Sequence, residues 1–152
     1  MKASKIFFIL GLLTTMSSVA ANYSIVHERV ERCDHGLNYY VLINPVTSHQ
    51  EAKNITQNIV HDLVKENPSQ DFGVLVFDNA DALEMKFESY SNPKLYSAEQ
   101  RAFINKHEVS EFQGKYTCRD ERVTSQITFV PRYYSDDGIT DRQVDAEFDP
   151  NF

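Results

Sequence analysis

The fold is decided by residues 39–78, which read YYVLINPVTSHQEAKNITQNIVHDLVKENPSQDFGVLVFD. The stretch opens with the apolar run Tyr39–Ile43 and closes with the apolar run Val74–Phe77. Both runs are short and rich in aromatic or β-branched residues, and strands that are apolar on both faces are typical of the centre of a sheet. A helical pattern lies between them. The stretch therefore predicts a βαβ unit whose two strands lie side by side and parallel.

Sequence signals mark both ends of the connecting helix. Ser48 and Glu51 form a capping box at its start, and Asn67-Pro68 stops it. Between these signals, one helical face carries the apolar residues Ala52, Ile55, Ile59, Leu63 and Val64. We expect this face to cover one side of the sheet, and the helices of the domain to pack mainly on that side.

The flanking segments extend this unit. Helices are predicted after Asp78 and after the capping box Ser97–Gln100. Residues 109–116, with a glycine typical of a bulge, and 123–129 predict an antiparallel hairpin, and residues 144–148 a short edge strand. Residues 22–36 fit a helical stripe or an extended arm, and we expect weak structure there. The predicted class is α/β (α+β), a two-layer mixed sheet built on a central βαβ unit with an antiparallel C-terminal hairpin.

Residues 1–21 have the pattern of a secretory signal peptide. Lys2 and Lys5 precede an apolar core that is too short for a stable membrane anchor, and small residues allow cleavage after Ala20 or Ala21. We expect residues 22–152 to form a single exported globular domain, periplasmic or secreted, with no membrane contact after the leader is removed.

The charge of the chain is acidic. The whole sequence has a formal net charge of −7, and loss of the two leader lysines leaves 13 basic against 22 acidic residues, a net charge of −9. This balance argues against nucleic acid and anionic membrane surfaces as partners, because both attract Lys- and Arg-rich patches. It permits a basic protein partner or a cation, and solubility alone also explains it.

Two cysteines, Cys33 and Cys118, are present. An even count in an oxidising compartment predicts a disulfide between them, and free or reactive thiols are the alternative. A loop this long gives a stabilisation of roughly 4 kcal/mol in the chain-entropy model.

Polar residues follow both predicted parallel strands. Ligands of open sheets bind beyond the carboxyl ends of such strands, where this chain has Asn44 after one strand and Asp78 and Asp81 after the other. The carboxylates are suitable oxygen ligands for a hard cation. Helix capping explains the same residue types without a ligand.

The remaining motifs predict no catalytic residue, metal site or cofactor. The five histidines form no zinc or metalloprotease spacing, and residues 136–141 lack the spacing of a calcium loop. Tyrosines are abundant, and Tyr133 and Tyr134 are the pair we expect in a recognition surface, since tyrosine combines contact area with a polar tip.

Residues 40–46, 74–79 with Ala82-Leu83, 107–114 and 129–131 carry a resemblance across most of the chain after the leader. In these strand and cap residues the chain resembles small bacterial α/β domains of uncharacterised function. The resemblance implies the fold and brings no activity.

Two functional hypotheses follow. The first is a non-enzymatic exported binding or interaction domain for a basic protein partner, based on export, net acidity, abundant tyrosine and the lack of catalytic signatures. The alternative is a small metal-assisted hydrolase or cation-binding protein that uses the rim around Asp78. The sequence leaves the oligomeric state open.

Overall fold

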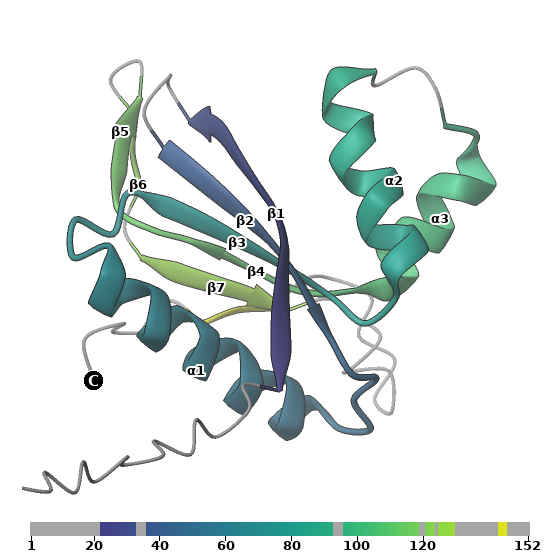
Figure 1. Cartoon of the computed structure of the whole chain (residues 1–152), viewed down its shortest axis with the longest axis horizontal. Coiled ribbons are helices and arrows are strands. Elements are labelled where there is room, and N and C mark those ends of the chain that lie inside the picture. Colours follow the sequence, from purple (N-terminus) through teal and green to yellow (C-terminus); the bar gives the residue numbers. More distant parts are fainter. Residues whose placement is uncertain are drawn as a thin grey trace, which may run out of the picture.

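The computed structural model describes residues 22–32, 36–92, 96–118, 121–123, 125–129 and 143–145. Within this part, a six-stranded sheet has the order β1-β2-β3-β4-β7-β8, and β5 and β6 form a separate two-stranded sheet. The described part also contains three helices, which pack around the sheets (Figure 1). The elements are β1 Tyr23–Arg32, β2 Gly36–Ile43, α1 His49–Glu66, β3 Phe72–Phe77, α2 Ala80–Ser91, α3 Ala98–His107, β4 Glu108–Gln113, β5 Tyr116–Cys118, β6 Glu121–Val123, β7 Gln126–Phe129 and β8 Gln143–Asp145.

The predicted βαβ unit is confirmed. Strands β2 and β3 are parallel, with a register that runs from Leu37 opposite Phe72 to Leu42 opposite Phe77, and α1 connects them. Both strands lie inside the sheet, and β4, β7 and β8 add to it in antiparallel fashion. The predicted α/β class with a mixed sheet is therefore correct.

Alternate residues of β2 point into two different cores. Tyr39, Val41 and Ile43 pack with the apolar face of α1, whereas Tyr40 packs in a second cluster with Leu83 of α2 and Ile104 of α3. The expectation that the helices pack mainly on one face is therefore wrong (Figure 1). A strand that is apolar on both faces needs cover on both sides, and α2 and α3 supply it on the second side.

The expectation of weak structure before the first predicted strand is also wrong. Residues 23–32 form β1, which pairs antiparallel with β2 along almost its whole length. The proposed helical stripe is not used, since Val26 and Val30 are both exposed. Backbone hydrogen bonding to β2 decides the conformation here, and the local pattern does not contain that partner.

The C-terminal part follows the prediction with two differences. Strands β4 and β7 pair antiparallel, and β8 is an edge strand bonded to β7, as expected. The chain leaves β4 at Gly114, and the segment predicted as one strand over 123–129 is divided between β6 and β7.

Candidate functional site

The carboxyl ends of β2 and β3 form the predicted rim. Asn44 and Asp78 line one depression of about 460 Å³ there, together with Tyr23 and Ser24 from the start of β1. Asp81 is exposed in the first turn of α2 and does not line the depression. The structure thus brings two of the three predicted rim residues together.

Asp78 is tied to the end of α3. Its Oδ1 lies 2.9 Å from Nδ1 of His107, and its backbone N–H donates to the His107 carbonyl oxygen at 3.2 Å. The neighbouring Asn79 caps α2 by accepting a hydrogen bond from the backbone N–H of Ala82. These contacts account for both side chains by internal bonding.

No group of three or more His, Cys, Asp or Glu side chains suited to a metal ion is found among the described residues. Within the same part of the chain, His107 is hydrogen-bonded to no hydroxyl or thiol that could act as a nucleophile. No specific observation thus favours the cation or hydrolase alternative at this rim, and it stays a prediction.

Three of the other predicted residues lie outside the described part of the chain. These are Tyr133 and Tyr134, predicted for recognition, and Cys33 of the predicted disulfide. The backbone of Cys118 belongs to β5. The disulfide therefore stays a prediction.

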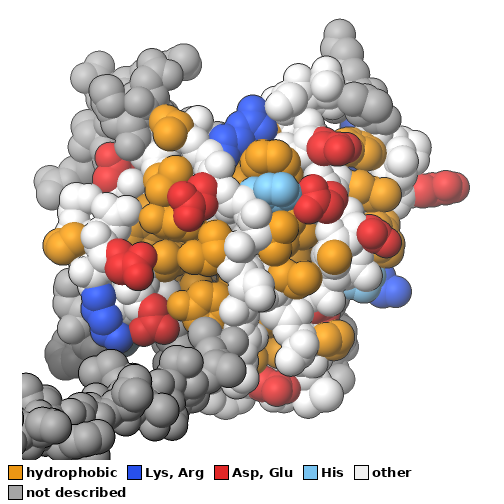
Figure 2. Space-filling view, viewed as in Figure 1, with side chains coloured by type: hydrophobic (Ala, Val, Ile, Leu, Met, Phe, Trp, Pro, Cys, Tyr) orange, Lys and Arg blue, Asp and Glu red, His pale blue; other side chains and the backbone are white. Residues whose placement is uncertain are grey.

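The most distinctive surface of the described chain is β1. This strand is the first in the order of the sheet, so one of its edges is paired with β2 and the other has no strand partner among the described residues. It carries three exposed large apolar side chains: Ile25, Val26 and Val30, of which Val30 is 60% exposed. Figure 2, which shows this side of the molecule, has hydrophobic side chains over much of the face and acidic side chains among them.

Two side chains of β1 fix it to α2. A register shift between Ile25 and His27 changes the alternation of the strand, and His27 and Arg29 then lie opposite Tyr40 and Asn38 of β2. His27 Nε2 lies 2.8 Å from both carboxylate oxygens of Glu84.

The same side of β1 also stacks on an aromatic ring. The His27 ring lies parallel to Phe87 at a centroid distance of 4.0 Å. Arg29 Nη1 donates to the Phe87 carbonyl oxygen at 3.2 Å, and its guanidinium lies over the Phe87 ring. Stacking, cation–π contact and hydrogen bonding together hold the inner side of β1 against α2.

The start of β1 is tied to α1. The Tyr23 hydroxyl donates to Asp62 Oδ2 at 3.3 Å, and Lys65 Nζ donates to Asp62 Oδ1 at 2.9 Å. The hydrogen bond from Lys65 lowers the pKa of Asp62, while burial and the nearby Asp62 charge raise the pKa of Tyr23. Side chains of β1 bond to α1 and to α2. The unpaired edge of the strand is therefore preorganised for binding.

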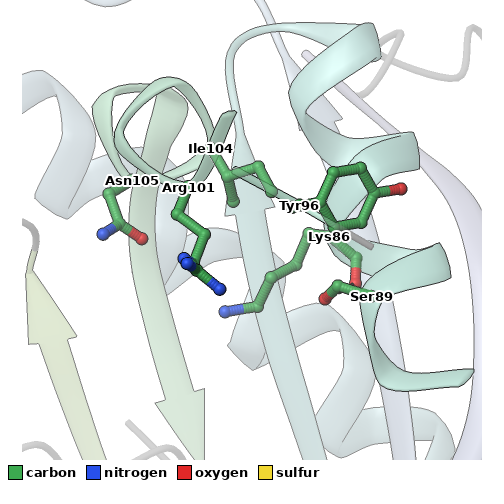
Figure 3. Close-up of a pocket in the computed structure, with 6 residues that line it drawn as sticks. All are labelled: Lys86, Ser89, Tyr96, Arg101, Ile104 and Asn105. Atoms are coloured by element: carbon green, nitrogen blue, oxygen red, sulfur yellow. Dashed lines mark hydrogen bonds between the residues drawn. The ribbon is translucent and has the colours of Figure 1, made fainter. Parts of the chain in front are cut away.

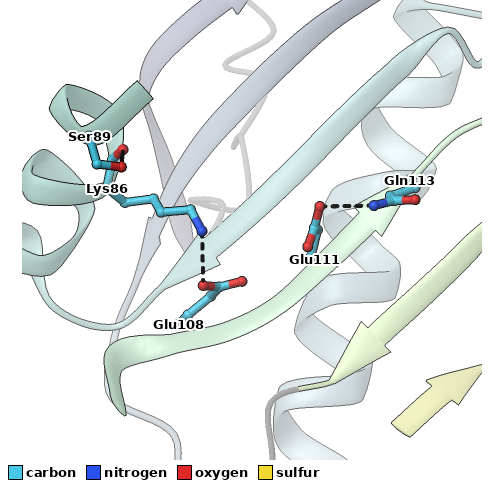
Figure 4. A network of polar contacts seen from close by, with 5 residues as sticks. All are labelled: Lys86, Ser89, Glu108, Glu111 and Gln113. Carbon is cyan, nitrogen blue, oxygen red and sulfur yellow. Dashed lines mark hydrogen bonds and ion pairs between the residues drawn. The ribbon is translucent and has the colours of Figure 1, made fainter. Parts of the chain in front are cut away.

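A polar network lies on the face of the sheet that α2 approaches (Figure 4). Lys86 Nζ of α2 reaches Oε2 of Glu108 on β4 at 3.4 Å, and Glu108 is fully buried. Further along β4, Gln113 donates to Glu111 at 3.1 Å. Sequence patterns could not predict this pair, because Lys86 and Glu108 belong to different elements.

Comparisons with known proteins add no family to this description. A scan against protein-family models, a search of curated proteins and a search of solved structures found no match. Among the described helices, none has the length and apolar character needed to cross a membrane.

Sequence reasoning missed β1 as a candidate surface. A signal for it was present, because residues 23–32 contain no glycine or proline and include the β-branched residues Ile25, Val26 and Val30. The polar residues between them interrupt the alternation of apolar and polar residues, so the segment was not recognised as a strand.

Proposed function

We propose that this chain is an exported, non-enzymatic binding domain, and that the outer edge of β1 pairs with an extended segment of a basic protein partner. The observation that carries the proposal is a ten-residue edge strand with three exposed apolar side chains. An exposed edge strand readily pairs with another chain, and β1 contains no proline to prevent this, although four of its ten residues are charged. Strand addition to a sheet edge is a common mode of peptide recognition.

The net charge of the chain supports a basic partner. Glu28 is exposed on β1, and the carboxylate of Glu84 lies next to the strand through His27. Arg29, a basic residue of the same strand, is held against α2 by Phe87. The two glutamates and two arginines of β1 cancel, so it is the overall net charge of −7 that favours approach of Lys- and Arg-rich segments.

Binding at β1 is tested with a matched pair of variants. Val30→Lys places a positive charge on the exposed edge, and Asn58→Lys adds the same charge at an exposed position of α1. A basic protein captured from envelope extract at low salt is purified and its affinity is measured by calorimetry. We expect Val30→Lys to weaken binding about tenfold, equivalent to about 1.4 kcal/mol, and Asn58→Lys to bind like the wild type.

Four results would contradict this assignment. Equal affinities of the two variants would remove β1 from the interface. Capture of no basic protein, or binding that does not weaken as salt is raised, would remove the proposed partner. A dimer that Val30→Lys dissociates would show that the edge pairs with a second copy.

Export and the disulfide are tested together by intact mass. The protein is isolated from the envelope fraction without reductant, and its mass is measured before and after reduction. We expect a chain that begins at Ala21 or Asn22, and a mass lower by two hydrogens before reduction, from the bond between Cys33 and Cys118. A retained Met1, or two thiols that react with iodoacetamide without reduction, would contradict these expectations.

A further inference from the structure

A small cavity lies between α2 and α3, away from the outer edge of β1. It has a volume of about 210 Å³. Its lining consists of side chains from the two helices and from the residue before the second capping box (Figure 3): Lys86, Ser89, Tyr96, Arg101, Ile104 and Asn105.

The lining contains two basic residues and no acidic residue. Figure 3 shows the ammonium group of Lys86 and the guanidinium group of Arg101 extending toward the same space from different helices. The charge of Lys86 is balanced by Glu108, whose Oε2 lies 3.4 Å from Lys86 Nζ. Among the described residues, the Arg101 guanidinium has no hydrogen bond or ion pair with any side chain. One of the two positive charges at this cavity therefore has no ion-pair partner among the described residues, in a chain with 22 acidic residues.

Tyr96 lines the cavity and is hydrogen-bonded to Glu88, which is not among the lining residues. The Tyr96 hydroxyl donates to Glu88 Oε2 at 2.9 Å, and this contact leaves the Tyr96 ring as a wall of the cavity. Ser89 is occupied as a donor, because its Oγ bonds to the Lys86 carbonyl oxygen at 2.7 Å. Ile104, which is almost fully buried, supplies an apolar part of the wall.

We propose that this cavity binds a small organic carboxylate. The carboxylate lies between Arg101 and Lys86, and the guanidinium can hold it through two parallel hydrogen bonds. The apolar part of the ligand lies against Ile104 and the ring of Tyr96, and the exposed amide of Asn105 offers a further polar contact. Inorganic phosphate matches the charge of the site but makes no use of its apolar walls.

The proposal is tested by titrating the full chain after leader removal with sodium benzoate, with sodium phosphate and with sodium chloride at constant ionic strength. Backbone amide shifts of α2 and α3 are followed by NMR. We expect saturable shifts around Ser89, Arg101 and Asn105 with benzoate, and no saturation with chloride.

Two variants on α3 distinguish the loss of a specific contact in the cavity from the loss of one positive charge on the protein. Arg101→Gln removes the guanidinium charge at the cavity, and Lys106→Gln removes one positive charge from an exposed residue of the same helix that does not line the cavity. We expect Arg101→Gln to weaken benzoate binding about tenfold or more, and Lys106→Gln to change it less than twofold. Both positions are exposed, so folded spectra are expected for both variants.

Any of three outcomes would overturn the proposal: no saturation with benzoate, saturation with phosphate alone, or equal affinities of the two variants. Failure of β1 to bind a basic protein would not affect the proposal of carboxylate binding in this cavity, because the two sites share no lining residue.

Discussion

Replacing Gly114 by alanine is expected to destabilise the fold by about 3 kcal/mol, the upper end of what overpacking a dense interior usually costs. A Cβ atom at this position would lie 1.9 Å from the Gln70 carbonyl oxygen and 2.6 Å from that of Phe72. Both contacts are to backbone atoms, so rotation of a side chain cannot relieve them. The Gly114 N–H also donates to the Phe72 carbonyl oxygen at 2.9 Å, and a shift of either segment would weaken this bond.

Gln70 has little freedom to move away from Gly114. Its backbone has a φ of 59°, in the left-handed region that non-glycine residues rarely adopt. Its N–H donates to the Asn67 carbonyl oxygen at 3.0 Å, and its buried side chain accepts from Ser125 Oγ at 2.9 Å. The turn before β3 is thus held by hydrogen bonds of both the backbone and the side chain of Gln70. The turn cannot move away from an added methyl group, so the methyl group destabilises the folded state.

Thermal and urea unfolding measure this effect. We expect the midpoint of thermal unfolding to fall by roughly 10 °C in Gly114→Ala. Lys115→Ala is the matched control, because the neighbouring side chain is exposed, and we expect a change of less than about 0.5 kcal/mol. A Gly114→Ala variant as stable as Lys115→Ala would show that the approach of Gly114 to Gln70 is not as close as described.

Gly114 also shows where prediction from sequence stops. The local pattern indicated a glycine at a bulge inside a strand, but Gly114 lies between β4 and β5, where the close approach of the backbone favours glycine for another reason. The reason is contact with Gln70, a residue 44 positions earlier in the chain, which no local pattern contains. The parallel pair β2 and β3 was predictable, because its two apolar runs and the helix between them all lie within 40 residues.

The candidate sites also divide into those that sequence patterns predict and those that depend on contacts between distant segments. The juxtaposition of Asn44 and Asp78 was predictable, because parallel strands end at the same edge of a sheet. The β1 edge was not, because the pairing of Tyr23–Arg32 with β2 is visible only in the assembled sheet. The cavity between α2 and α3 was also missed, because Lys86 and Arg101 come together only through packing of the two helices.

Lys86→Met is expected to destabilise the protein by about 3 kcal/mol, although the ion pair that it breaks is not short. Lys86 Nζ lies 3.4 Å from Glu108 Oε2, and the side chain of Glu108 is 0% exposed while that of Lys86 is 21% exposed. Removing the cation takes a positive charge away from a buried carboxylate, and breaking a fully buried pair costs about 3–5 kcal/mol. The partial exposure of Lys86 places this pair at the lower end of that range.

The matched control is the same substitution at a surface pair. Lys65 Nζ lies closer to its partner, at 2.9 Å from Asp62 Oδ1, but the two side chains are 74% and 50% exposed. We expect Lys65→Met to cost less than about 1 kcal/mol, because water screens the pair and solvates Asp62 when the cation is lost. Burial, not distance, therefore decides which substitution is severe.

A double variant separates the buried charge from the packing of the lysine chain. Lys86→Met combined with Glu108→Gln removes both charges and keeps the shape and hydrogen-bonding capacity of the Glu108 side chain. We expect it to recover at least about 1 kcal/mol relative to Lys86→Met alone in urea unfolding, as a coupling between contacting residues. If the double variant is no more stable than Lys86→Met, the loss comes from the packing of Lys86 over Tyr90, whose ring centroid lies 5.8 Å from Nζ, and not from the buried carboxylate.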